Sequence, residues 1–160
     1  MRRKQLGLAL LSAALTLLLT GCFVKTVDEL YTLPRHSDEY DRLELAIEKV
    51  LPSQNASYAP PVSGVNQQSV QLADLDGDGM DEAIAFLKAA GDKPLRACIF
   101  SHADGDYHLT DVIEGDGTSF ASVEYVQLTD RPGIELVIGW QLSTDVLQSL
   151  GAYSYADGHV

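Results

Sequence analysis

The hydrophobic residues follow two different spacings along the chain. Between residues 37 and 51 apolar side chains recur every three or four positions, which is typical of one face of a helix. Ser37 can cap the start of this helix and Pro52 ends it. From residue 69 onward the apolar residues instead fall in short runs rich in Val, Ile, Tyr and Phe, which are typical of strands. The expected helix face is Leu43, Leu45, Ala46, Val50 and Leu51, and the expected strands are 69–73, 83–88, 95–101, 106–113, 119–128, 134–140 and 147–155.

The segment between the helix and the strands, residues 52–68, is rich in Pro, Ser, Asn and Gly and is predicted to be a linker. The fold class expected from these patterns is mainly β, with antiparallel strands preceded by one short helix. Cys98 lies in an apolar run and is expected to be a small buried core residue.

The strand-rich half contains an internal repeat. Residues 70–74, Val-Gln-Leu-Ala-Asp, recur as Val-Gln-Leu-Thr-Asp at 126–130, an offset of 56 residues, and after a three-residue deletion the offset becomes 53. At that second offset Glu82 matches Glu135, and the Ala-Asp-Gly at 103–105 matches the one at 156–158. The repeat predicts two copies of one four-stranded antiparallel unit, of the kind that forms a propeller blade.

An acidic loop carries the clearest chemistry in the sequence. Carboxylates at its positions 1, 3 and 5 with Gly at position 6 suit Ca²⁺, which takes six to eight oxygen ligands. The expected ligands are Asp74, Asp76, Asp78, the Met80 carbonyl at position 7 and Glu82 at position 9, with Asp81 as a possible substitute. The alternative is a solvated Asp-Gly turn without an ion, although five acids in nine residues repel one another unless a cation offsets them.

A strand-flanked loop with an acid at position 9 resembles the calcium loop of FG-GAP, or VCBS, repeats, which are known from integrin-type β-propellers. A helix-loop-helix calcium site would need Glu at position 12, where this chain has Ala85. The resemblance implies a first blade at 69–124 that holds the calcium loop and a second, degenerate and incomplete blade at 125–160. Because propellers close with about four blades, we expect the chain to be either a fragment of a larger array or an unclosed pair of blades.

The second copy of the loop departs from the pattern. Residues 130–135 read Asp-Arg-Pro-Gly-Ile-Glu, so the middle carboxylates are lost and a cation is gained, and no metal is expected there. Two other acidic segments, 104–106 and 114–117, fit hairpin turns better than cation sites.

The N-terminal residues have the composition of an export signal. Residues 1–21 combine Arg2, Arg3 and Lys4 with an uncharged apolar stretch and then small residues. The Leu-Thr-Gly-Cys at 19–22 resembles the bacterial lipobox, which implies lipidation of Cys22, a tether at 22–36 and an extracytoplasmic domain anchored to the bacterial cell membrane. An ordinary secretory signal with a chance cysteine is the alternative.

Charge and motif content narrow the function classes. The formal net charge of −12 argues against nucleic acid as a partner, since phosphate binding needs basic residues. No nucleophile elbow, HExxH motif, phosphate loop or dinucleotide motif is present. We therefore expect a non-enzymatic binding or scaffold module with structural Ca²⁺ and a cell-surface protein or glycan as partner. The alternative is the N-terminal part of an extracellular hydrolase or carbohydrate-acting protein whose catalytic residues lie beyond residue 160.

Overall fold

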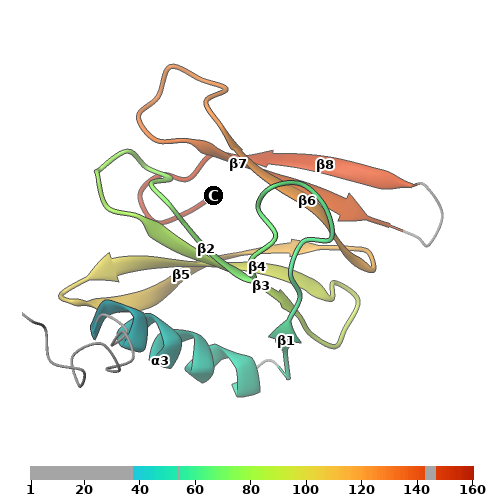
Figure 1. Ribbon diagram of the computed structural model, residues 1–160, viewed down its shortest axis with the longest axis horizontal. Coiled ribbons are helices and arrows are strands. Elements are labelled where there is room, and N and C mark those ends of the chain that lie inside the picture. The colour runs from blue at the N-terminus through green and yellow to red at the C-terminus, as the bar shows by residue number, and fades with distance from the viewer. Residues whose placement is uncertain (1–37, 54, 143–146) are drawn as a thin grey trace, which may run out of the picture. The chain divides into compact units, whose positions relative to one another are not determined.

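The computed structural model describes residues 38–53, 55–142 and 147–160 of the chain (Figure 1). The expected signal peptide, the lipidation of Cys22 and the tether fall on residues 1–37 and so lie outside the described residues. The elements are α3 (Asp38–Ser53), β1 (Ser57–Tyr58), β2 (Val70–Ala73), β3 (Glu82–Lys88), β4 (Leu95–Ala103), β5 (Asp106–Gly115), β6 (Ser119–Val126), β7 (Glu135–Gln141) and β8 (Gln148–Tyr153). The mainly β class with one preceding helix is confirmed for this part of the chain.

The first sheet has five strands in the order β1-β3-β4-β5, and β2 also pairs with β3. All of its pairs are antiparallel. Strands β1 and β2 share one edge of β3, because Tyr58 lies opposite Leu87 while β2 lies opposite residues 82–85. Strands β2 to β5 therefore form a four-stranded antiparallel meander, to which β1 adds a short extension.

The second sheet is an antiparallel meander in the order β6-β7-β8. Strand β6 begins at Ser119, so the chain leaves the first sheet between residues 115 and 119. The boundary between the two blades was expected after residue 124. That position is too late, because the strand that begins at Ser119 already pairs with β7 in the second sheet.

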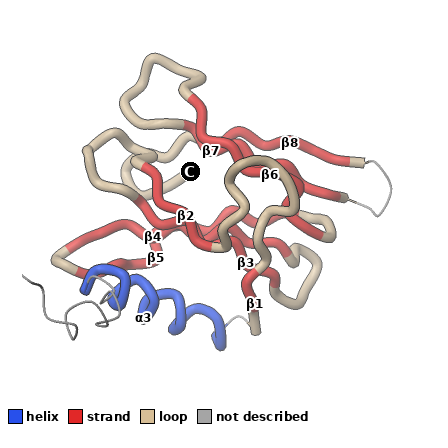
Figure 2. The backbone as a smooth tube through the Cα atoms, viewed as in Figure 1, coloured by secondary structure: helices blue, strands red, loops and turns tan. Residues whose placement is uncertain are grey.

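The first sheet is buried on both faces. Ile84 and Phe86 of β3 join a core shared with β6 and β7, whereas Ala83, Ala85 and Leu87 join a core shared with α3. Phe86 and Phe120 meet edge to face, with ring centroids 5.0 Å apart. The helix and the second sheet thus cover opposite faces of the first sheet, as Figures 1 and 2 show. Burial on two faces explains why β3 is a continuous apolar run and not an alternating one.

Helix α3 extends two residues beyond the expected end at residue 51. Its buried face is Leu43, Ala46, Ile47 and Val50, a spacing of three and four residues. Leu45, which was expected on this face, is 57% exposed. Pro52 lies inside the last turn, and Asn55 follows with a φ of 48°, a left-handed conformation that commonly ends helices.

Much of the expected linker, residues 52–68, is held to the second sheet. The backbone N–H groups of Val62 and Ser63 donate to the carbonyls of Phe120 and Ala121, both at 3.0 Å. Asn66 Nδ2 donates to the carbonyl of Val123 at 3.0 Å. In Figure 1 this segment is the green loop that rises from β1 to β6 and returns to β2. Polar composition predicted a linker, but these residues form a pairing segment along the outer edge of β6.

The repeat keeps a single offset of 53 residues in the structure. Ala73 pairs with Glu82 in the first sheet, and Val126 pairs with Glu135 in the second. Ala103 pairs with Asp106, and Ala156 forms a bridge with His159. The expected offset of 56 between the two Val-Gln-Leu segments is therefore wrong, because Val126 occupies the place of Ala73 and not that of Val70.

The acidic turn 104–105 is a two-residue hairpin connection, as expected. Asp104 has a φ of 55° and Gly105 a φ of 87°, and their counterparts Asp157 and Gly158 have nearly the same values. Residues 114–117 were also expected in a hairpin turn, but they end β5 and lead into the second sheet. Cys98 is buried, as expected, and burial raises the pKa of its thiol to about 11. In the described ranges, no helix combines the length and apolar character needed to cross a membrane.

Candidate metal centre

The acidic loop joins β2 to β3 and brings three carboxylates together. Asp74, Asp76 and Asp78 each offer one oxygen, and these oxygens lie within 4.8 Å of one another. Asp74 and Asp76 are half-buried, and Asp78 is exposed. Three anionic oxygens at this spacing can hold a metal ion, and they are the hard ligands that Ca²⁺ and Mg²⁺ take in proteins.

Side-chain to backbone hydrogen bonds give the loop its shape. Asp74 accepts from the backbone N–H of Gly77 at 2.7 Å and from that of Gly79 at 3.1 Å, one bond on each carboxylate oxygen. Asp76 Oδ1 accepts from the N–H of Asp78, and Asp78 Oδ1 accepts from the N–H of Met80. This series of local turns coils the chain around the three carboxylates, since Asp favours such self-bonded turns.

Glu82 lies at the base of the loop as the first residue of β3. Its side chain is 3% exposed, and its Oε2 accepts from the backbone N–H of Leu75 at 2.9 Å. Burial raises the pKa of Glu82 to about 7, and the negative charges of Asp76, Asp78 and Asp74 add to this effect although the Leu75 bond opposes it. A buried acid next to three carboxylates is an environment that a bound cation would stabilise.

The other expected ligands have different positions. Asp81 is exposed and lines a hollow beside α3 together with Glu39 and Tyr107, so it is not one of the three clustered acids. Met80 has an exposed side chain, and its N–H closes the turn on Asp78. The ligand roles of the Met80 carbonyl and of Glu82 stay predictions.

The second copy of the loop uses a different set of side chains around the same buried acid. Glu135 Oε2 accepts from the N–H of Leu128 at 2.8 Å, which repeats the bond between Leu75 and Glu82. Thr129 donates its hydroxyl to the other oxygen of Glu135. At the 53-residue offset Arg131 stands in place of Asp78. The Thr129 bond, the Leu128 bond and the Arg131 charge lower the pKa of Glu135.

The two loops are in direct backbone contact. A Cβ added at Gly77 would overlap the backbone nitrogen of Gly133, and one added at Gly133 would overlap the carbonyl of Leu75. Both glycines have positive φ, 80° for Gly77 and 84° for Gly133. The acidic loop is therefore packed against the loop of the second sheet, a contact for which the sequence carried no recognisable signal.

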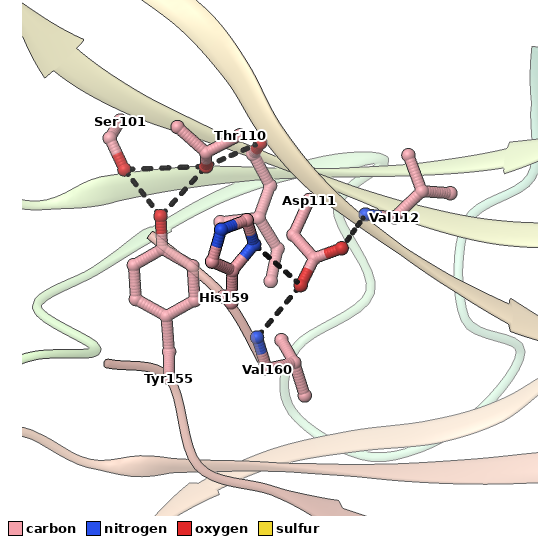
Figure 3. A network of polar contacts seen from close by, with 8 residues as sticks. Ser101, Thr110, Asp111, Val112, Tyr155, His159 and Val160 are labelled. Carbon is pink, nitrogen blue, oxygen red and sulfur yellow. Dashed lines mark hydrogen bonds and ion pairs between the residues drawn. The ribbon is translucent and has the colours of Figure 1, made fainter. Parts of the chain in front are cut away.

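A second polar cluster joins the C-terminal residues to the first sheet (Figure 3). The hydroxyl of Tyr155 lies 2.7 Å from the hydroxyls of both Ser101 and Thr110. Thr110 is the extra residue of a bulge, because Phe100 pairs with Leu109 and Ile99 pairs with Asp111. This cluster at the bulge holds the residues that follow β8 against β4 and β5.

The same segment is held a second time at Asp111. Its Oδ2 accepts from the backbone N–H of Val160 at 2.7 Å and lies 3.9 Å from Nδ1 of His159 (Figure 3). His102, by contrast, stacks edge to face on Tyr107, with ring centroids 5.3 Å apart. His102 and His159 thus make contacts between elements.

Comparisons of the chain with models of protein families, with curated proteins and with solved structures gave no match.

Proposed function

We propose that this chain is a membrane-anchored, extracytoplasmic lipoprotein whose β-sheet unit binds structural Ca²⁺ and acts as a non-enzymatic binding or scaffold module. Calcium binding is supported above all by the cluster of Asp74, Asp76 and Asp78. Their ligand oxygens lie within 4.8 Å of one another on a loop between two strands. The donor set fits a hard divalent cation, since carboxylate oxygens are its preferred ligands.

The contrast between the two loops supports a cation in the first of them. Glu82 and Glu135 occupy the same place in the repeat and make the same bond to a backbone N–H. The pKa of Glu135 is lowered, first by the bond from Thr129, whereas that of Glu82 is raised, first by its burial and then by the charges of three aspartates. The second loop carries its own cation as Arg131, and the first would obtain one by binding Ca²⁺.

The arrangement of the sheets supports FG-GAP-like blades. Strands β2 to β5 form a four-stranded meander with the acidic loop between its first two strands, and β6 to β8 repeat the first three strands at a 53-residue offset. The two sheets also share one core, as neighbouring blades do. Bound Ca²⁺ would then stiffen the corner where the loops of the two sheets meet, which favours a structural role over a catalytic one.

The lipid anchor is tested by metabolic labelling with radioactive palmitate in a bacterial host. We expect label on the wild-type chain, loss of the label in Cys22→Ser, and full label in the control Cys98→Ser, because Cys98 is buried in the core. An unlabelled wild-type chain, or equal label in Cys22→Ser, would contradict the lipoprotein assignment. Since labelling does not depend on the acidic loop, this result is independent of the calcium proposal.

A further inference from the structure

A groove of about 570 Å³ lies between helix α3 and strand β2. Leu43 and Ile47 of the helix and Val70 of the strand give it apolar walls, and Leu72, which is 40% exposed, lies along its length. The groove uses none of the three clustered aspartates, so it is a separate site from the acidic loop.

One wall of the groove is an open strand edge. The N–H of Phe86 donates to the carbonyl of Ser69 at 2.8 Å, and hydrogen-bonded pairs alternate along an antiparallel ladder. The N–H and C=O groups of Val70 and Leu72 therefore point away from β3. Within the described part of the chain, neither residue has a backbone hydrogen bond on that side. A strand edge beside a helix is the geometry in which extended peptides bind as an added strand.

The rim of the groove is acidic and aromatic. Asp41 and Glu44 line it, as do Tyr40 and Tyr58, which are 55% and 45% exposed. Among the residues that the structure describes, no Lys, Arg or His lines it. The pKa of Tyr58 is raised by its partial burial and then by the charges of Glu44 and Glu48. Carboxylates and exposed tyrosine rings both attract cationic side chains, the rings through cation–π contact.

We propose that the groove binds an extended, basic peptide segment of a partner protein. The segment pairs with β2 through the free N–H and C=O groups of Val70 and Leu72. It places a Lys or Arg side chain against Asp41 and Glu44. This inference rests on the binding role proposed above and names the class of partner that would be bound. The residues that carry it lie outside the calcium loop.

The test measures fluorescence anisotropy of labelled six-residue peptides added to the full chain in detergent. The probes are an alternating Lys-Val peptide, its Glu-Val counterpart and the Lys-Val peptide N-methylated at alternate backbone nitrogens. We expect the Lys-Val peptide to bind, and the other two to bind at least tenfold more weakly, because one loses the charge match and the other loses the pairing N–H groups.

The protein variants separate the groove from the overall negative charge. Glu44→Lys is expected to weaken binding of the Lys-Val peptide about tenfold, whereas the matched control Asp92→Lys, in an exposed turn, changes it less than twofold. Peptide binding is measured in EGTA and in Ca²⁺ and is expected to be the same in both, so failure here is distinct from failure of the calcium site. The proposal is overturned by an absence of binding at millimolar peptide or by equal affinity for the Lys-Val and Glu-Val peptides. Equal affinity for the N-methylated peptide also overturns it, since the groove would then take a side chain alone.

Discussion

Gly77→Ala and Gly133→Ala are each expected to lower the free energy of unfolding by at least about 3 kcal/mol. Each glycine has a left-handed φ, which costs an L-residue about 1 to 2 kcal/mol. A methyl group at either position also overlaps backbone atoms of the opposite loop, and backbone cannot move aside as a flexible side chain does. The measurement is urea unfolding in EGTA, so that metal binding does not contribute to the difference.

Gly79→Ala in the same loop is the matched control. Gly79 has a φ of 89°, but a Cβ there would meet nothing within 4 Å. Alanine at this position strains only the backbone, so the free energy of unfolding should fall by about 1 to 2 kcal/mol. If Gly77→Ala and Gly79→Ala destabilise the protein equally, the two loops are not in the contact described above.

Glu82→Gln is expected to stabilise the calcium-free protein at pH 8 by about 2 to 3 kcal/mol. The pKa of Glu82 is raised from its ordinary 4.5 to about 7 in the folded state. Between these pH values the folded protein keeps a proton that the unfolded chain has released, so the free energy of unfolding falls as the pH rises. The glutamine keeps an oxygen for the N–H of Leu75 and has no charge to bury. Urea unfolding in EGTA from pH 4 to pH 8 measures the difference.

The equivalent substitution in the second loop, Glu135→Gln, is expected to destabilise the protein where Glu82→Gln stabilises it. The pKa of Glu135 is lowered, so its ionised form is favoured by folding. Glu135→Gln should therefore lower the melting temperature at pH 7, and this loss should shrink as the pH falls below 4.5. A stabilising Glu135→Gln, or a destabilising Glu82→Gln at pH 8 in EGTA, would contradict the electrostatic contrast between the loops.

Features of the molecule that depend on neighbouring residues were predictable from the sequence. The aspartates at 74, 76 and 78 come together because turns of two to five residues place them there. The hairpin turn at 104–105 and the alternation of strands follow from equally local spacing. Phe120 and Trp140 are in the core because large aromatic side chains in strands are usually buried there.

Features that depend on distant segments were not predictable in the same way. Residues 62–66 have a linker composition, but they bond to β6, more than fifty residues away. The contact between Gly77 and Gly133 has the same non-local origin. Leu45 was expected on the buried face of α3 because its side chain is apolar. It lies next to Ala46 in the sequence but outside the buried face, and it is exposed.

Calorimetric titration of Ca²⁺ into the metal-free full chain tests the central claim most directly. We predict one equivalent of Ca²⁺ for the wild-type chain, and affinity at least tenfold weaker in Asp76→Ala. Asp76→Asn should also bind more weakly, although it keeps an acceptor for the N–H of Asp78 and so preserves the turn. Asp130→Ala in the second loop is the matched control and should bind as the wild type does. The absence of any binding heat in the wild type, or an unchanged affinity in Asp76→Ala, would contradict a calcium site in this loop.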